Sequence, residues 1–192
     1  MNIGLYFGAF NPVHNGHTEV ANYVLNNSSL DKVWLVLTPQ SPHKTENILI
    51  DFNHRYKMLE IACKNYKNVI AIDIEKNLPT PNYSINTLDY LKKRNNINKY
   101  SLIIGNDNLK KLSSWKEYSR IIDNHKIYVY PRDLSDENYK LEHKNINYLK
   151  APYIDISGST IRKKIISNQM DDLKINANVF KYLINNNIKI NV

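Results

Sequence analysis

Short apolar runs alternate along the chain with longer segments in which apolar residues recur every three or four positions. Short runs bounded by turn-forming residues are typical of buried strands, and the longer spacing is typical of helices with one buried face. The pattern predicts five strands, at residues 3–7, 33–37, 69–72, 101–104 and 127–130. Two shorter strand candidates follow, at residues 146–149 and 153–156.

Helices are predicted between and after these strands. The first begins at His17, and another has Ser84 as its N-cap, since a serine hydroxyl readily accepts a free backbone N–H. The remaining apolar faces lie in residues 56–66, 115–122, 160–167 and 177–186. Strands that alternate with helices across short loops form a parallel sheet with helices on both faces. We therefore expect an α/β protein with a single domain over residues 1–192, whose C-terminal part is helical from about residue 159.

Length and charge narrow the class of protein. The 192 residues match one ordinary domain, and the formal net charge is +8. Because the excess charge comes from scattered lysines, 21 against 5 arginines, we expect no nucleic-acid partner. No apolar run approaches the roughly 18 to 20 residues of a membrane span, and a strand occupies the place of a secretion signal. We expect a cytoplasmic protein without a membrane partner, and either a monomer or a homo-oligomer.

Glycine and arginine are rare in this chain, so their positions are informative. Four of the five glycines follow strand-like runs: Gly8, Gly16, Gly105 and Gly158. Glycine there permits a positive φ or a close approach of a ligand to the backbone. Two arginines, Arg132 and Arg162, also lie just beyond predicted strands, and arginine holds phosphate oxygens with a fixed fork of donors.

The carboxyl ends of parallel strands meet at one edge of a sheet, and ligands bind there. We therefore expect one site from the loops at residues 8–17, 38–44, 105–108, 131–132 and 157–162.

The first seventeen residues, MNIGLYFGAFNPVHNGH, combine a strand, a glycine-containing loop and the start of a helix. Backbone N–H groups in such a loop and at a helix N-terminus bind anions. His14 and His17 flank that position at a spacing of three. An isolated pair of this kind more often caps or packs a helix start, but the glycines and the distant segment ISGSTIR favour a catalytic role.

FGAFNPVHNGH and ISGSTIR together resemble the paired signatures of the HxGH nucleotidyltransferase superfamily. The blocks between them resemble the bacterial-type nicotinate-nucleotide adenylyltransferase family, in the same order: TPQSPHK, HRYKMLEIA, DIE, PNYSINTL, IIGNDNL, Trp115 and YPR. The resemblance implies a Rossmann-like open parallel sheet of the nucleotidyltransferase type. It also implies transfer of AMP from ATP to nicotinate mononucleotide, with release of pyrophosphate and with Mg²⁺ bound to ATP, as a step of NAD biosynthesis.

The resemblance further implies roles for individual residues. The implied catalytic residues are His14, His17, Lys44 and Arg162. The implied ATP-binding residues are Gly8, Ala9, Phe10, His14, His17, Gly105, Asp107, Arg132, Ser157, Ser159 and Arg162. The implied binding residues for the pyridine substrate are Tyr83, Thr87 and Trp115. We expect no metal site made by the protein, because no cluster of possible ligands has suitable spacing.

Adenylyl transfer needs alignment and charge stabilisation but no protein nucleophile. We expect His14 and His17 to donate to phosphate oxygens, and Arg162 to hold the leaving pyrophosphate. Trp115 would stack on the pyridine ring while backbone N–H groups near Thr87 and Trp115 bind its carboxylate. This arrangement predicts a preference for nicotinate over nicotinamide mononucleotide.

Two positions depart from the family pattern. Ala9 stands where the family usually has a hydroxyl, and Gly158 replaces the second serine of SSTxIR. Ser159 keeps a hydroxyl three residues before Arg162, and Thr160 is the alternative donor after a small register change. Two other functions therefore stay open: adenylyl transfer to another phosphorylated metabolite such as pantetheine phosphate, and an inactive nucleotide-binding module.

Overall fold

A computed structural model describes residues 1–39, 49–132 and 139–190. The strands are β1 (Asn2–Gly8), β2 (Lys32–Leu37), β3 (Val69–Ile72), β4 (Lys99–Gly105), β5 (Ile127–Tyr130) and β6 (Ile146–Tyr148). The α-helices are α1 (Asn15–Asn26), α2 (Phe52–Cys63), α3 (Ser84–Arg94), α4 (Asn106–Lys110), α5 (Tyr118–Asn124), α6 (Gly158–Ile166) and α7 (Ala177–Asn185). Two 3₁₀ turns are η1 (Ile74–Asn77) and η2 (Leu112–Ser114).

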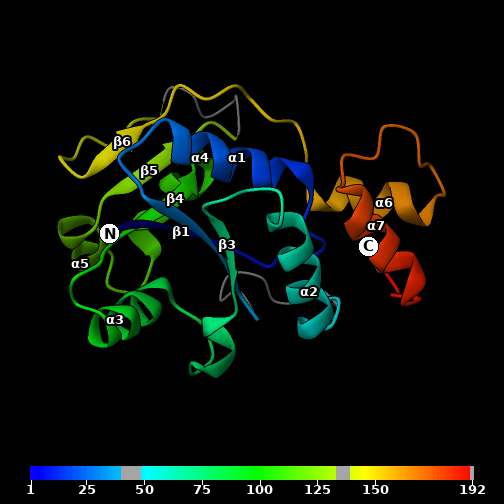
Figure 1. Cartoon of the computed structure of the whole chain (residues 1–192). Coiled ribbons are helices and arrows are strands. Elements are labelled where there is room, and N and C mark those ends of the chain that lie inside the picture. Colours follow the sequence, from blue (N-terminus) through cyan, green and yellow to red (C-terminus); the bar gives the residue numbers. More distant parts are fainter. Residues whose placement is uncertain (40–48, 133–138, 191–192) are drawn as a thin grey trace.

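The strands form one sheet in the order β3-β2-β1-β4-β5-β6, and every neighbouring pair is parallel (Figure 1). The chain builds one half of the sheet outward from β1 and then returns to build the other half from β4. The strand order therefore reverses between β1 and β4, and in open parallel sheets this switch point is where ligands bind. The expected α/β fold with an open parallel sheet is confirmed.

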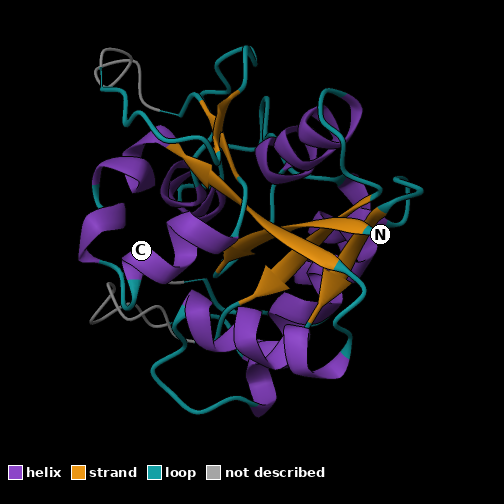
Figure 2. Cartoon of the chain, turned by 90° about the vertical axis from the view of Figure 1, so that its left-hand side faces the viewer, coloured by secondary structure: helices purple, strands orange, loops and turns teal. Residues whose placement is uncertain are grey.

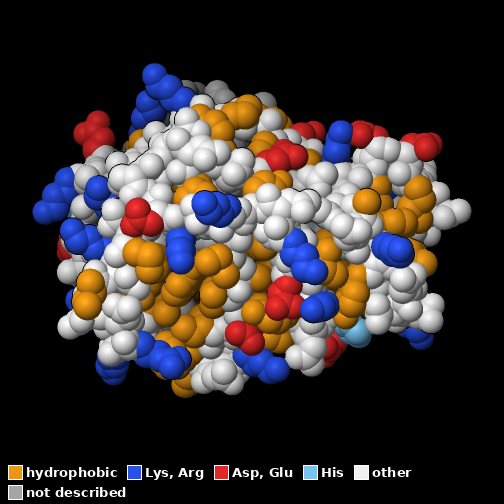
Figure 3. Space-filling view, viewed as in Figure 1, with side chains coloured by type: hydrophobic (Ala, Val, Ile, Leu, Met, Phe, Trp, Pro, Cys, Tyr) orange, Lys and Arg blue, Asp and Glu red, His pale blue; other side chains and the backbone are white. Residues whose placement is uncertain are grey.

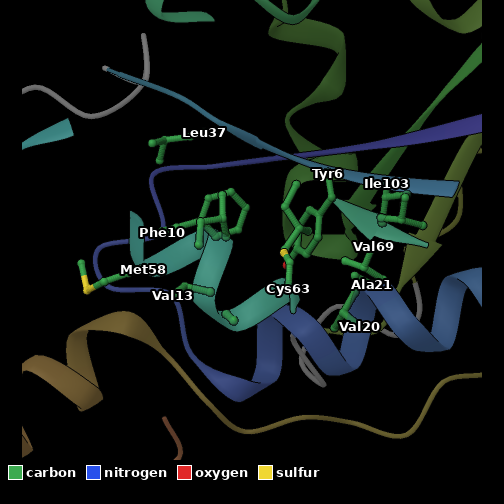
Figure 4. Packing of buried hydrophobic residues seen from close by; sticks show 14 of the residues in the cluster. Tyr6, Phe10, Val13, Val20, Ala21, Leu37, Met58, Cys63, Val69 and Ile103 are labelled. Atoms are coloured by element: carbon green, nitrogen blue, oxygen red, sulfur yellow. The ribbon is translucent and has the colours of Figure 1, made fainter. Parts of the chain in front are cut away.

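The sheet separates two apolar cores, with helices on both of its faces (Figure 2). One core packs α1, α2 and α7 against strand residues that include Leu35 and Ile103 (Figure 4). The other packs α3, α4 and α5 against the neighbouring strand residues, including Val36 and Ile104. Successive strand residues point to opposite faces, so a strand covered on both faces reads as a continuous apolar run.

The five predicted strands are confirmed as β1 to β5, and the candidate at residues 146–149 is confirmed as β6. The candidate at residues 153–156 is wrong. Ile154 and Ile156 pack against the core that contains α1, so their apolar character comes from that packing and not from strand pairing.

Several helices begin at other residues than predicted. The first helix begins at Asn15, with His14 as its N-cap. Ser84 is the first helical residue of α3, and its N-cap is Tyr83. Glu117 has a left-handed φ of 54°, which breaks the predicted helix at residues 115–122, so α5 begins at Tyr118.

The C-terminal helices lie at one end of the molecule, where α7 packs on α2 (Figure 1). The α6 helix begins at Gly158, two residues before the predicted start. Lysine and arginine side chains are dispersed among acidic and uncharged ones on the face in Figure 3. Within the described ranges, no helix is both long and apolar enough to cross a membrane.

Candidate active site

A cavity of about 500 Å³ opens at the switch point, where β1, β4 and β5 end and α6 begins. It brings together most of the residues that the sequence singled out. The predicted residues in its lining are Gly8, Ala9, Phe10, His14, His17, Tyr83, Gly105, Asp107, Trp115, Arg132, Ser157, Ser159 and Arg162. Thr87 is completely buried and is absent from this lining. Lys44 lies outside the described residues.

The loop after β1 is shaped by close contact between Gly8 and Phe10. A Cβ atom on Gly8 would lie 2.9 Å from the ring of Phe10, too close for any larger residue. Phe10 itself has a φ of 42°, in the left-handed region that a bulky residue rarely adopts. No described glycine has a positive φ, so close approach, and not backbone freedom, explains Gly8.

His17 is oriented by the backbone at the start of α1. The N–H of His14 donates to Nδ1 of His17 at 3.2 Å. A neutral His17 therefore carries its proton on Nε2, which is the nitrogen that can donate. The ring packs edge-on against Phe10, with 4.9 Å between centroids, and this packing limits its rotation.

His14 is buried beside His17, and the two rings stack with 3.7 Å between centroids. Burial, followed by the positive charge of Arg132, lowers the pKa of His14 to about 4. His14 is therefore neutral near pH 7 and can donate through one nitrogen without carrying a charge. Its Nδ1 has no hydrogen-bond partner in the described part of the chain.

Arg55 in α2 fastens the loops that line one side of the cavity, a role that the sequence did not reveal. Its guanidinium donates to the carbonyl oxygens of Ile50, Ala9, Thr38 and Pro39, at 2.8 to 3.2 Å. The side chain is 2% exposed, and burial lowers its pKa to about 10. Arg55 therefore stays charged near pH 7 and places a buried cation behind the loop after β1.

Asp107 and Arg132 face the cavity from the ends of β4 and β5. Their side chains form an ion pair, with 3.6 Å between Nη1 and Oδ2. The side-chain oxygen of Asn106 holds this corner together by accepting from the backbone N–H groups of Asp107 and Arg132. A Cβ atom on Gly105 would meet Oδ1 of Asp107 at 2.3 Å, so a larger residue here would displace the Asp107 side chain. Behind them, the hydroxyls of Tyr6 and Tyr130 hydrogen-bond at 2.7 Å inside the protein.

The start of α6 completes the wall that the resemblance predicts to bind phosphate, here called the phosphate-facing wall. Ser157 is its N-cap and accepts from the N–H of Thr160, while the Ser157 hydroxyl also contacts those of Ser159 and Thr160. Arg162 lies one turn into the helix, inside the helix predicted for residues 160–167, and its Nη1 donates to the carbonyl of Asn11. Residues far apart in the sequence are thereby tied together across the cavity.

Gly158 shows no steric requirement for glycine. A Cβ atom there would lie 3.5 Å from Arg162 and 3.7 Å from Asn11, which are ordinary contacts. The departure from the family's serine therefore removes a hydroxyl without reshaping the helix start.

The opposite end of the cavity is lined by Trp115, Lys116, Tyr83 and Ser84. The ammonium of Lys116 lies 4.9 Å from the ring centre of Tyr83. Thr87 lies one turn into α3, behind this wall, and its N–H points to the carbonyl of Tyr83 at 3.4 Å. The N–H of Asn86 donates to the same carbonyl at 2.9 Å, and of the residues in the first turn of α3 Ser84 lines the cavity.

The hydroxyl of Thr87 instead donates to Oε1 of Glu75 at 2.7 Å. Glu75, in η1, is 1% exposed and forms part of the cavity wall. Glu75 lies in the DIE block that follows β3, but its position in the sequence does not indicate that its side chain is buried.

The cavity offers few ligands to a metal ion. Among residues 1–39, 49–132 and 139–190, no group of three or more histidines, cysteines or carboxylates could hold one. Asp107 is a carboxylate next to the phosphate-facing residues, and its Oδ1 is buried without a hydrogen-bond partner in the described structure. This donor set fits Mg²⁺ that is held mainly by substrate phosphates and water.

Comparisons with known proteins identify the family of this chain. Residues 5–164 match the model of the cytidylyltransferase-like family. A probable nicotinate-nucleotide adenylyltransferase from Flavobacterium psychrophilum is 42% identical, with 97% of this chain and 98% of that protein covered. A protein of the same name from Bacteroides fragilis is 33% identical, with coverages of 94% and 90%.

The fold is also found among solved structures. The Plasmodium falciparum nicotinic acid mononucleotide adenylyltransferase complexed with NaAD superposes with a TM-score of 0.78 at 21% identity, covering 97% of this chain and 96% of that one. With the sequence relatives at high coverage, the chain belongs to the cytidylyltransferase-like family and, within it, to the nicotinate-nucleotide adenylyltransferases.

Proposed function

We propose that the cavity binds ATP at its phosphate-facing wall and nicotinate mononucleotide at the end beside Trp115, and that it joins them. The product is nicotinate adenine dinucleotide, and pyrophosphate leaves. The observation that carries the proposal is the convergence of His14, His17, Arg132 and Arg162 on one cavity from the ends of two strands and from two helices. Such a set of donors suits a substrate with several phosphates.

In the reaction, a phosphate oxygen of the mononucleotide attacks the α-phosphorus of ATP. The bond from that phosphorus to the oxygen bridging to the β-phosphate breaks, and its electron pair leaves with pyrophosphate. His17 donates from Nε2 to an oxygen that gains charge, and neutral His14 supports it from the same wall. Arg162 and the Ser157 hydroxyl hold the leaving phosphates, and Lys44 is a further candidate for this role.

The α6 N-terminus adds to the attraction for phosphate, because the first N–H groups of a helix carry partial positive charge. The start of α1 contributes less than expected, since the N–H of Asn15 already donates to the carbonyl of Lys174. Mg²⁺ bound with ATP would neutralise phosphate charge, with Asp107 as the nearest protein carboxylate on that wall.

Pyrophosphate release tests the function directly. The purified protein should release pyrophosphate from ATP with Mg²⁺ and nicotinate mononucleotide, and should form the dinucleotide in equal amount. Release with pantetheine phosphate but not with the pyridine mononucleotide would identify the other acceptor class. ATP binding without turnover of either acceptor would identify an inactive module.

Substrate choice tests the pyridine end. A carboxylate accepts from backbone N–H groups on both oxygens, whereas an amide presents an NH₂ donor to them and leaves an N–H unpaired. We expect kcat/KM to favour nicotinate over nicotinamide mononucleotide by at least about tenfold. Equal use of the two would contradict the placement of the pyridine pocket and leave the transfer chemistry intact.

A further inference from the structure

Glu75 is a buried carboxyl group that the phosphate chemistry does not use. It stands in the cavity wall on the same side as Asn82, Tyr83 and Ser84, at the end proposed for the pyridine ring. Its Oε1 accepts from the Thr87 hydroxyl at 2.7 Å, and its backbone carbonyl accepts from the side chain of Asn82 at 3.1 Å. Glu75 is thus joined to α3 and to the segment that precedes it.

The hydrogen bonds around Glu75 leave one oxygen unmatched. Oε2 is buried and has no hydrogen-bond partner in the described structure, and neither has the side-chain oxygen of Asn82. An ionised carboxylate would bury a charge there with only the neutral hydroxyls of Thr87 and Thr38 to stabilise it, which is costly. A proton on Oε2 removes the charge and turns one of these acceptors into a donor.

Charged groups near Glu75 do not compensate for a negative charge. Burial raises the pKa of Glu75, and only the hydroxyls of Thr87 and Thr38 act in the other direction. Lys76, next in the chain, points to the side chain of Asn53, and Lys116 lies over Tyr83. No described ammonium or guanidinium forms an ion pair with the Glu75 carboxyl.

We propose that Glu75 is a specificity-determining residue, whose neutral form admits the nicotinate carboxylate and whose ionised form repels it. This inference rests on the proposed function. When Glu75 is neutral, the ring carboxylate of the substrate can approach the pyridine end of the cavity. An ionised Glu75 would repel that carboxylate through a medium of low dielectric constant. Nicotinamide mononucleotide carries no ring carboxylate and escapes this repulsion. The proton on Glu75 therefore sets how strongly the enzyme distinguishes the acid from the amide.

The test measures kcat/KM for both mononucleotides over a pH series that runs upward from the ordinary pKa of a glutamate, about 4.3. The ratio of the two values isolates the effect, because ATP, His14 and the substrate phosphate titrate alike with either substrate. In the wild type the ratio of nicotinate to nicotinamide should fall by at least about tenfold as Glu75 ionises. In Glu75→Gln, which keeps the shape and an acceptor for Thr87 but cannot ionise, the ratio should stay level.

Two substitutions of Thr87 test the ionisation of Glu75 while leaving its carboxyl group in place. The Thr87 hydroxyl stabilises the ionised form, so Thr87→Val should shift the fall in the ratio to higher pH. Thr87→Ser keeps the hydroxyl and should leave the midpoint unchanged. If Glu75 had only a structural role, a substitution at Thr87 would lower kcat/KM for both mononucleotides by the same factor. The pH at which the ratio falls would then stay the same.

A level ratio in the wild type, or the same fall in Glu75→Gln, would overturn the inference while the enzyme still uses pyridine mononucleotides. Failure to use either mononucleotide at any pH would instead overturn the proposed function. The two failures are therefore distinguishable in one set of assays.

Discussion

His14 and His17 show how neighbouring residues of the same type acquire different tasks. His17 accepts a backbone N–H on Nδ1, which fixes the proton on Nε2. His14 is buried and has its pKa lowered to about 4. Neither histidine needs to be charged, because a neutral imidazole N–H already serves as a donor.

Substituting His17 tests the transition-state role. His17→Ala should lower kcat by at least about 100-fold while the protein remains folded, as expected for a preorganised donor to an oxygen that gains charge. Steady-state kinetics and circular dichroism of the purified variant provide the measurement. His143→Ala is the matched control, since His143 pairs with Asp123 away from the cavity. Near-normal kcat in His17→Ala would contradict the mechanism.

The hydroxyls at the start of α6 provide a second test. Ser159 lines the cavity, whereas Thr160 does not, although both hydroxyls contact that of Ser157. Ser159→Ala should lower kcat/KM for ATP by about tenfold, the usual cost of one hydrogen bond to a charged group. Thr160→Val should have a smaller effect. The opposite order, measured in parallel, would mean that the hydroxyl donor is one residue further along.

The residues that the sequence could predict are those whose neighbours in the chain form a motif. His14, His17 and Arg162 stand in such segments, and the structure brings them to one cavity. Arg55 and Glu75 also lie in quoted blocks, HRYKMLEIA and DIE, but those blocks did not indicate what either side chain does. Arg55 binds carbonyl oxygens, which every residue has, and Glu75 pairs with a threonine twelve positions away. Such partners are visible only after the chain has folded.

At the scale of elements, apolar runs predict strands well when both faces of the sheet are covered. The strand predicted at residues 153–156 is wrong because packing against a helix buries apolar residues just as pairing in a sheet does. The short helix α4 is absent from the pattern, since five residues show too little periodicity. The order of the strands also lies beyond the pattern, because alternation implies parallel strands but not which of them are neighbours.

Arg55 in α2 binds the loop after β1 and the segment after β2, so replacing it should loosen both from α2. Arg55→Met keeps the bulk of the side chain but leaves four buried or partly buried carbonyl groups without their donor. We expect a loss of at least about 3 kcal/mol in the free energy of unfolding, from the unpaired carbonyls together. Urea unfolding measures it, and Arg94→Met, at the exposed end of α3, is the control. A loss equal to that of the control would mean that the bonds of Arg55 contribute little.

At the scale of the whole molecule, His14 makes stability depend on pH. Its pKa is 6.5 in the unfolded chain and about 4 in the fold, so between these values only the unfolded chain binds the proton. The stabilisation is fully present above about pH 6.5 and is lost as the pH falls through this window, by roughly 3 kcal/mol in total.

The measurement is urea unfolding of the wild type and of His14→Asn at both ends of that window. Asparagine does not titrate, so the variant should lose less stability on acidification than the wild type does. Equal losses in the two proteins would show that other groups account for the acid sensitivity.

The buried position of Arg55 has a consequence for how the protein responds to ionic strength. Dissolved salt screens charges that face water but reaches a buried charge only weakly. The field of Arg55 extends to the loop after β1 through protein, whereas the side chains of Arg132 and Asp107 are partly exposed to solvent. Part of the attraction for phosphate should therefore persist at high salt. KM for ATP should rise with added potassium chloride to a plateau, and not continue upward as it would for a site built from surface lysines alone.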